Sequence, residues 1–226
     1  MTSRMPVSAQ EHYESLLADH YEWMFGLPFE AKVAEQKGVL DEFAGTDVTG
    51  GLAVDLGCGP GFQSFALSDR GYQVIAIDTS EKLLRNLSAR VGSRNIVTKH
   101  ADLRELDSLV RPASVEIAIC MGDTLTHLPS RAEVSRLFQS VANTLKPGGR
   151  IVVTYRDLAS AELFALDRFI PVRSDDRRVM TCFLKYETAE TVVVHDLINV
   201  RDDDGDWTLH KSSYKNLRLP AEWVIA

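Results

Sequence analysis

The feature that most constrains this chain is the stretch Val54-Asp55-Leu56-Gly57-Cys58-Gly59-Pro60-Gly61. Three glycines in five positions disfavour the interior of a strand or helix, because glycine loses more backbone entropy on folding than any other residue. Residues 51–54 read as a short buried strand, and residues 62–67 read as the first turns of a helix. The pattern therefore predicts a sharp turn from strand to helix, where bare backbone amides face a ligand.

Strand-like and helix-like segments alternate after this loop. We expect strands over residues 52–56, 73–77, 96–100, 115–120 and 151–155, and helices over residues 62–70, 81–91 and 131–145, with Gly71 and Ser80 as helix caps and residues 146–149 as a turn. Short apolar strands separated by helices predict an α/β fold with a doubly wound, Rossmann-like, mainly parallel sheet. Ligands of such sheets bind at the carboxyl ends of the strands.

The segments on either side of this core differ from it. Residues 8–44 read as helices that are interrupted at Gly26-Leu27-Pro28. Residues 178–187, 191–200 and 207–216 read as an antiparallel meander, and another helix begins near Pro220. We expect one domain, with an N-terminal helical cap (residues 1–50), a ligand-binding core (51–157) and an antiparallel lid (158–226).

Composition limits the classes of binding partner and the cellular location that we expect. The 226 residues include 25 Lys and Arg against 32 Asp and Glu, a net charge of −7, which disfavours nucleic acid as the main partner. Three widely spaced cysteines, Cys58, Cys120 and Cys182, match no metal site or disulfide framework, so we expect buried thiols and no metal. No signal peptide or membrane span is predicted, which indicates a soluble, cytoplasmic protein. The oligomeric state is left open.

Two carboxylates sharpen the choice of ligand. The loop is Gly-x-Gly-x-Gly, which differs from the Gly-x-Gly-x-x-Gly of dinucleotide-binding dehydrogenases. Asp55, inside the strand end, would repel a pyrophosphate but suits a ligand with an ammonium group. Asp78 follows the second strand, the usual position of a carboxylate that accepts ribose hydroxyls. A nucleoside with a cationic amino-acid tail meets these requirements, and S-adenosylmethionine is such a molecule.

The chain resembles the class I S-adenosylmethionine-dependent methyltransferases at four ordered landmarks. These are residues 54–61, Ala76-Ile77-Asp78-Thr79-Ser80, Ala101-Asp102-Leu103 and Leu145-Lys146-Pro147-Gly148-Gly149-Arg150. The resemblance implies cofactor contacts at Asp55, Gly57, Cys58, Gly59, Gly61, Asp78, Thr79, Asp102, Leu103, Cys120 and Met121. It implies that Asp78 binds the ribose and that Asp102 and Leu103 bind the adenine. It also implies that Asp55, through its neighbours, and the Cys120 carbonyl bind the methionine ammonium. The product would be S-adenosylhomocysteine.

A narrower resemblance concerns the acceptor side. Residues 121–128 and Thr154-Tyr155-Arg156-Asp157 are similar to segments of glycine and sarcosine N-methyltransferases, in which an arginine after the fifth strand grips the substrate carboxylate. The N-terminal segment does not match these enzymes. Family members also end with further strands of the core sheet. We therefore expect either a C-terminally truncated chain with a poorly covered sheet edge, or a meander that supplies those strands.

Methyl transfer from a sulfonium needs alignment and at most one base, so few catalytic residues are required. His127 is the candidate base, with an ordinary loop histidine as the alternative. Arg156 is the candidate anion clamp, and its alternative is an ion pair with Asp157 or Asp123. Asp123 is a substrate contact or a cap. Tyr13 and Tyr21 are predicted to fold over the cofactor, although core packing would also explain them.

The leading hypothesis is thus a methyltransferase that N- or O-methylates a small-molecule acceptor. A nucleotide-dependent oxidoreductase is the first alternative, against which the glycine spacing and Asp55 count. A non-catalytic subunit that binds S-adenosylmethionine is the second. A nucleic-acid or protein acceptor is disfavoured by the acidic composition.

Overall fold

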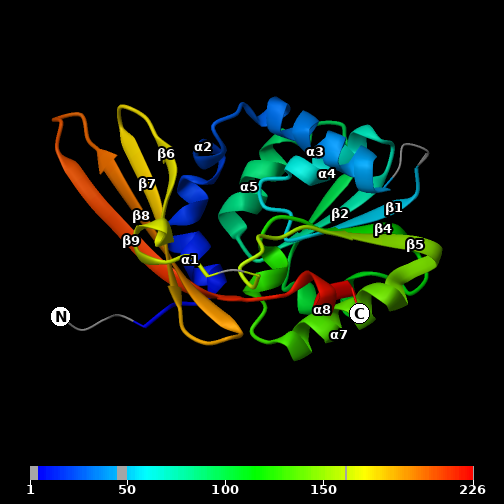
Figure 1. Ribbon diagram of the computed structural model, residues 1–226. Coiled ribbons are helices and arrows are strands. Elements are labelled where there is room, and N and C mark those ends of the chain that lie inside the picture. The colour runs from blue at the N-terminus through cyan, green and yellow to red at the C-terminus, as the bar shows by residue number, and fades with distance from the viewer. Residues whose placement is uncertain (1–4, 45–49, 161, 226) are drawn as a thin grey trace. The chain divides into compact units, whose positions relative to one another are not determined.

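The structure is a computed structural model that describes residues 5–44, 50–160 and 162–225. Its residues form two compact units (Figure 1). The parallel-sheet unit is Leu27–Arg156, and the antiparallel-sheet unit combines Met1–Gly26 with Asp157–Ala226. The helical residues before Gly26 therefore fold together with the C-terminal third of the chain, whereas the helix after Pro28 belongs to the parallel-sheet unit.

The parallel-sheet unit alternates strands and helices as predicted. Its elements are α3 (Phe29–Ala44), β1 (Leu52–Leu56), α4 (Phe62–Asp69), β2 (Gln73–Asp78), α5 (Glu81–Arg90), β3 (Ile96–His100), η2 (Leu103–Glu105), α6 (Leu106–Leu109), β4 (Val115–Cys120), η3 (Thr124–His127), α7 (Arg131–Thr144) and β5 (Leu145–Val153). All strand pairs are parallel, in the order β3-β2-β1-β4-β5. Figure 1 shows α3 and α4 on one face of the sheet and α7 on the other. The predicted fold class is confirmed, and the strand order reverses between β1 and β4.

Burial explains why these segments form strands and helices. Ala53, Val54 and Leu56 of β1 are fully buried, as expected for a central strand covered on both faces. Helix α5 begins at the predicted cap, where the Leu83 amide donates to the Ser80 hydroxyl over 3.3 Å. Gly71, with φ +90°, allows the turn after α4.

The start of β5 differs from the prediction. Leu145 already pairs with Val115, but the next partners are Arg150 and Ile117, so the residues between Leu145 and Arg150 bulge out of the ladder. The predicted turn is therefore a bulge inside a strand that begins earlier and ends at Val153, before the predicted end at residue 155.

The antiparallel-sheet unit contains α1 (Ala9–Ser15), η1 (Leu17–Asp19), α2 (Tyr21–Phe25), η4 (Ala165–Arg168), β6 (Phe169–Ser174), β7 (Arg178–Tyr186), β8 (Thr191–Arg201), β9 (Trp207–Leu217) and α8 (Ala221–Ile225). The predicted meander is present as β7, β8 and β9, and β6 is an unpredicted fourth strand. These strands pair with one another in the order β6-β7-β8-β9 and form a separate sheet. The hypothesis that the meander supplies missing strands of the parallel sheet is therefore wrong.

Specific contacts join the N-terminal helices to this sheet. The buried His12 of α1 binds Asp196 of β8 at 2.8 Å, from Nε2 to Oδ2. The indole N–H of Trp23 donates to Asp175 at 2.5 Å. The expected first helix is divided at Leu16, whose φ of −140° and ψ of −62° lie outside the helical region, and α2 ends at the left-handed Gly26.

All three cysteines are buried, which confirms that part of their prediction. Among the described residues, no helix has the length and apolar character needed to cross a membrane.

Candidate functional site

The glycine loop is fastened to the carboxyl end of β2. The amides of Gly57 and Cys58 both donate to the Ile77 carbonyl, at 2.8 and 3.0 Å. Gly57 has φ +74°, and a Cβ there would overlap the Thr124 side chain. Gly61 has φ +100°, and its Cβ would lie 2.7 Å from Leu87 Cγ. Both positions therefore require glycine for conformation and for space.

Asp78 links this loop to the next helix. One carboxylate oxygen accepts the Gly59 amide at 2.8 Å, and the other accepts the Ser80 amide at 2.7 Å. Asp78 is thus in direct contact with the glycine loop, a contact that was not predicted. Two amide bonds do not exhaust the about four lone pairs of a carboxylate, so ligand hydroxyls fit the same group.

Asp55 lies beneath the loop with only 1% of its surface exposed. Its Oδ2 accepts a hydrogen bond of 2.6 Å from the buried Ser64 hydroxyl. Burial raises the pKa of Asp55 to about 7, and the negative charge of Asp78 adds to the rise, while Ser64 opposes it. Near neutral pH this carboxyl is therefore poised between its neutral and ionised forms.

Asp102 and Leu103 follow β3 as predicted, but Asp102 is already engaged. Its two oxygens accept hydrogen bonds from Arg104 Nε and Nη2, at 2.7 to 3.0 Å, and Oδ1 also accepts the Arg104 amide at 2.8 Å. Burial alone raises the pKa of Asp102, but Arg104 outweighs it, so this pKa lies below its ordinary value. Asp102 is therefore ionised at neutral pH.

Cys120 is the last residue of β4 and Met121 follows it, and both are buried. The Cys120 carbonyl accepts the Thr154 amide at 3.1 Å, and the Thr154 hydroxyl accepts the Gly122 amide at 3.0 Å. Burial raises the pKa of the Cys120 thiol to about 12 and that of Cys58 well above its ordinary value, so both thiols stay protonated. The cysteines thus contribute backbone and packing, not a nucleophile.

The three predicted catalytic residues follow β4 and β5. Asp123 accepts two hydrogen bonds from Arg156, one from its amide at 3.0 Å and one from its guanidinium Nε. The Asp123 side chain does not cap η3, whereas the expected alternative of an ion pair between Asp123 and Arg156 is present. His127 is the last residue of η3 and is half-buried.

Tyr13 and Tyr21 belong to the antiparallel-sheet unit, with ring centroids 5.7 Å apart. Both pack against a buried cluster that includes Met180 and Ile198, so the core-packing alternative describes their contacts there. Thr79 follows Asp78, and its carbonyl accepts a hydrogen bond of 3.0 Å from His100 Nε2. The cofactor roles predicted for these three residues stay predictions.

Three residues at this edge were not predicted as part of the site. Ser64 lies in the first turn of α4, three residues after Gly61, and this position close to the loop was a usable signal. Arg104 binds Asp102 two residues before it, a side-chain contact that the residue pattern did not indicate. Thr154 was noted only as part of the segment around Arg156, and its contact with Gly122 joins two distant segments.

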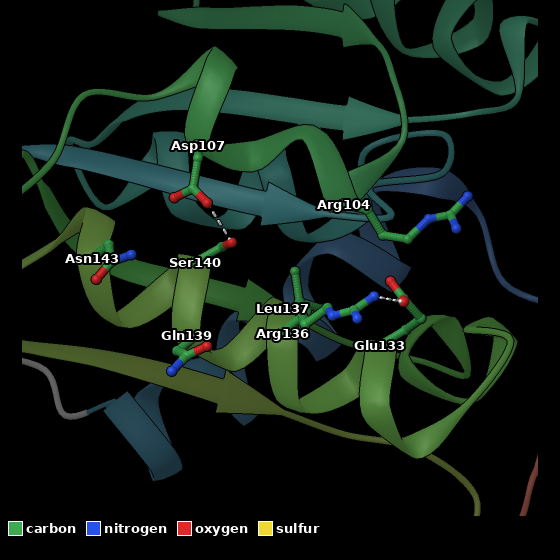
Figure 2. A pocket seen from close by; sticks show the side chains of 8 residues that line it. All are labelled: Arg104, Asp107, Glu133, Arg136, Leu137, Gln139, Ser140 and Asn143. Carbon is green, nitrogen blue, oxygen red and sulfur yellow. Dashed lines mark hydrogen bonds and ion pairs between the residues drawn. The ribbon is translucent and has the colours of Figure 1, made fainter.

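A pocket of about 310 Å³ lies elsewhere on the same unit, between η2 and α6 on one side and α7 on the other (Figure 2). It is lined by Arg104, Asp107, Glu133, Arg136, Leu137, Gln139, Ser140 and Asn143. Its charges pair locally: Arg136 binds Glu133, and the Ser140 hydroxyl donates to Asp107 at 2.6 Å. It contains none of the predicted site residues. Among the described residues, no three His, Cys, Asp or Glu side chains are grouped to hold a metal ion.

Comparisons with known proteins agree with this geometry. Residues 53–149 match the family model described as a methyltransferase domain. YqeM of Bacillus subtilis, a putative methyltransferase by its name, is 29% identical over 65% of this chain and 59% of its own length. Glycine N-methyltransferase of Mus musculus is 29% identical over 46% of this chain and 40% of its own length. This chain therefore spans less than two thirds of either curated relative.

A solved structure extends the likeness to the fold of nearly the whole chain. The structure of CalS10 with bound S-adenosylmethionine, from Micromonospora echinaspora, superposes with a TM-score of 0.71, 14% identity and coverage of 99% of this chain and 87% of that one. CalS10 is described as an amino pentose methyltransferase. Residues 53–149 thus match a methyltransferase domain, and nearly the whole chain shares its fold with a solved S-adenosylmethionine-bound methyltransferase.

Proposed function

We propose that this protein transfers a methyl group from S-adenosylmethionine to a nitrogen or oxygen atom of a small molecule. The observation that carries the proposal is the joined arrangement of Asp55, the glycine loop and Asp78 at the switch point of the sheet. It places two carboxylates beside a loop in which Gly57 and Gly61 leave no room for a Cβ atom. This combination suits a nucleoside with a positively charged tail better than it suits a pyrophosphate.

The residues present fit S-adenosylmethionine, which when bound supplies a methyl group on a positively charged sulfur with an activated leaving group. Asp78 would accept the ribose hydroxyls, and Leu103 with Asp102 would bind the adenine. The ionised form of Asp55 would stabilise the ammonium through the loop, with the Cys120 carbonyl nearby. Cys58, Thr79 and Met121 would line the site, and Tyr13 and Tyr21 would cover it.

Few further groups are needed, because the reaction is an in-line displacement. The acceptor lone pair forms the new bond to carbon as the carbon–sulfur bond breaks, and the electron pair of that bond stays on sulfur as the neutral thioether. The acceptor then loses a proton, for which His127 is the proposed base. Arg156 would hold an anionic group of the acceptor, with Asp123 fixing the orientation of its guanidinium.

Titration calorimetry and product release test the whole proposal. We expect binding of S-adenosylhomocysteine in the micromolar range, a typical small-ligand affinity (~−8 kcal/mol). A screen of amines, amino acids and phenols should identify an acceptor that drives steady release of S-adenosylhomocysteine. No binding at millimolar cofactor would contradict the proposal, and NADH binding would favour the oxidoreductase alternative. Binding without turnover on any acceptor would instead favour the non-catalytic subunit.

The Arg156→Ala variant tests the acceptor side. A lost charge-assisted hydrogen bond costs about 1.5–3 kcal/mol, so kcat/KM for acidic acceptors should fall about tenfold to hundredfold. Neutral acceptors and cofactor affinity should change little. Arg136→Ala is the matched control, since that exposed arginine pairs with Glu133 away from the strand ends. Equal losses for acidic and neutral acceptors would show that Arg156 is structural.

A further inference from the structure

Arg104 contacts the Asp102 carboxylate through three of its nitrogen atoms. The Arg104 amide donates to Oδ1 at 2.8 Å, Nη2 donates to Oδ2 at 2.7 Å, and Nε lies 3.0 Å from both oxygens. Both residues belong to one turn, because Asp102 is the N-cap of η2 and Arg104 is the second residue of η2. The contact therefore forms locally, and it fixes the plane of the carboxylate.

This contact also decides the charge of a half-buried acid. The Asp102 side chain is 30% exposed, and burial raises its pKa, but the hydrogen bonds and charge of Arg104 lower that pKa below its ordinary value. Asp102 in turn raises the pKa of Arg104, and Glu133 and Glu105 add to this rise, so the guanidinium keeps its charge. Figure 2 shows the Arg104 side chain pointing away from Ser140 at the other end of the pocket. Asp102 is therefore ionised, and its oxygens only accept hydrogen bonds.

The acceptor positions of Asp102 are nearly filled by Arg104. An ionised carboxylate offers about four acceptor positions on its two oxygens. The Arg104 amide, Nε and Nη2 provide three donors, since the single hydrogen on Nε is shared by both oxygens. About one position remains for a ligand. That position accepts an N–H or O–H group, and it repels a carbonyl oxygen because both atoms are then acceptors with negative charge.

We propose that Arg104 is a positioning residue that makes Asp102 select adenine over a purine with a carbonyl group in place of the amino group. This role rests on the proposed function, in which Asp102 binds the adenine of the cofactor. The exocyclic amino group of adenine donates hydrogen bonds, whereas hypoxanthine has an oxygen acceptor at that position. Ionised Asp102 accepts from the amino group and has no hydrogen to donate to the oxygen. A protonated Asp102 would serve either base, so Arg104 sets the preference by fixing both charge and orientation.

A pair of ligands that differ only at this group tests the preference. Calorimetry measures the Kd of S-adenosylhomocysteine and of its deaminated analogue S-inosylhomocysteine at pH 5 and pH 8. The readout is the ratio of the two Kd values. Asp55, with a pKa of about 7, titrates between these pH values, but it acts on the amino-acid tail that both ligands share, so its effect cancels in the ratio. The wild type should favour S-adenosylhomocysteine at least about tenfold at both pH values, because the analogue leaves a charged acceptor unpaired.

Arg104→Ala should lower this ratio about threefold to tenfold at pH 8, where Asp102 is ionised but no longer held in place. The ratio should fall further at pH 5, because Asp102 without the guanidinium takes up a proton more readily. Arg104→Lys keeps the charge but not the planar fork, so its ratio should be partly restored and independent of pH. Carboxyl NMR of the protein without ligand should show a higher pKa of Asp102 in Arg104→Ala than in the wild type. Arg94→Ala is the matched control, since it breaks an exposed pair with Asp69 on the same unit.

The outcomes separate this role from the proposed function. An Arg104→Ala ratio equal to that of the wild type at both pH values would overturn the role of Arg104, and so would an equal loss in the Arg94→Ala control. A wild type that binds both ligands equally would overturn the selection by Asp102 and leave cofactor binding intact. A wild type that binds neither ligand would contradict the proposed function itself. The Arg104 side chain is 48% exposed, so the variants should fold, which circular dichroism checks.

Discussion

Asp55→Asn should weaken the binding of S-adenosylhomocysteine at pH 8 about tenfold to hundredfold and, at the same pH, stabilise the protein without cofactor by about 2 kcal/mol. The two effects have one cause. The folded chain encloses a carboxyl whose ionised form is costly when buried, and that same ionised form suits a cationic ligand. Asparagine removes the charge and retains an oxygen that accepts the Ser64 hydrogen bond.

The sign of the stability effect follows from the pKa values. The pKa of Asp55 rises from 3.8 to about 7 on folding, so the folded state holds the proton more tightly than the unfolded state. The contribution of this group is fully present below pH 3.8 and is lost as pH rises through about 7. A tenfold change in proton affinity is worth ~1.4 kcal/mol, which makes ~2 kcal/mol a conservative gain at pH 8. At pH 4 the variant and the wild type should differ little.

Urea unfolding at pH 4 and pH 8, with calorimetry of ligand binding, measures both effects. Binding to the wild type should tighten from pH 6 to pH 8 and release protons into the buffer, because the ligand favours ionised Asp55. The Asp55→Asn variant should lose this dependence. Asp69→Asn is the control, since Asp69 is an exposed acid paired with Arg94 on the same unit. A variant that is no more stable at pH 8 would show that Asp55 is ionised at little cost.

Asp78→Ala should reduce cofactor affinity about a thousandfold, the second large effect. The change removes the acceptor proposed for two ribose hydroxyls, and hydrogen bonds to a charged group are worth about 1.5–3 kcal/mol each. It also releases the amides of Gly59 and Ser80, so the loop loses its link to α5. The loss should appear for S-adenosylmethionine and S-adenosylhomocysteine alike.

Calorimetry with both ligands measures this effect, and Asp69→Ala serves as the control. Thermal unfolding in the absence of ligand shows whether the fold survives the change. A more conservative Asp78→Asn variant retains one acceptor oxygen and should recover part of the affinity. If Asp78→Ala bound as tightly as the control, Asp78 would be a structural link and not a ribose ligand.

The extent to which the fold was predictable differs between the two units. The strands and helices of the parallel sheet have local signals, namely apolar runs, the Ser80 cap and the turn at Gly71. Strand β6 contains Pro171 and has no regular alternation that sets it apart, so its pairing with β7 was not predictable. The joining of α1 to β8 by His12 and Asp196 links residues that lie far apart in sequence.

The candidate site also has features that the sequence predicted and features that it did not. Glycine spacing and the acids after β1 and β2 indicated the loop and Asp78, because parallel strands bring their carboxyl ends to one edge. The engagement of Asp102 by Arg104, and of Asp123 by Arg156, depends on side-chain rotamers and on which groups meet after folding. The sequence offered Asp123 or Asp157 as the partner of Arg156, and the structure selects Asp123, whereas the pair of Asp102 with Arg104 was not predicted.

The residue pattern by itself determined a strand–loop–helix turn at residues 54–61, because glycine is the residue that tolerates positive φ there without steric cost. It also determined an acid at the end of β2 and the class of ligand that these groups suit. Only the tertiary structure decided that the Asp55 carboxyl is buried with a pKa of about 7. It also decided that Asp78 binds the loop directly and that the C-terminal strands form their own sheet. Burial and pairing depend on contacts between distant segments, and local sequence does not encode them.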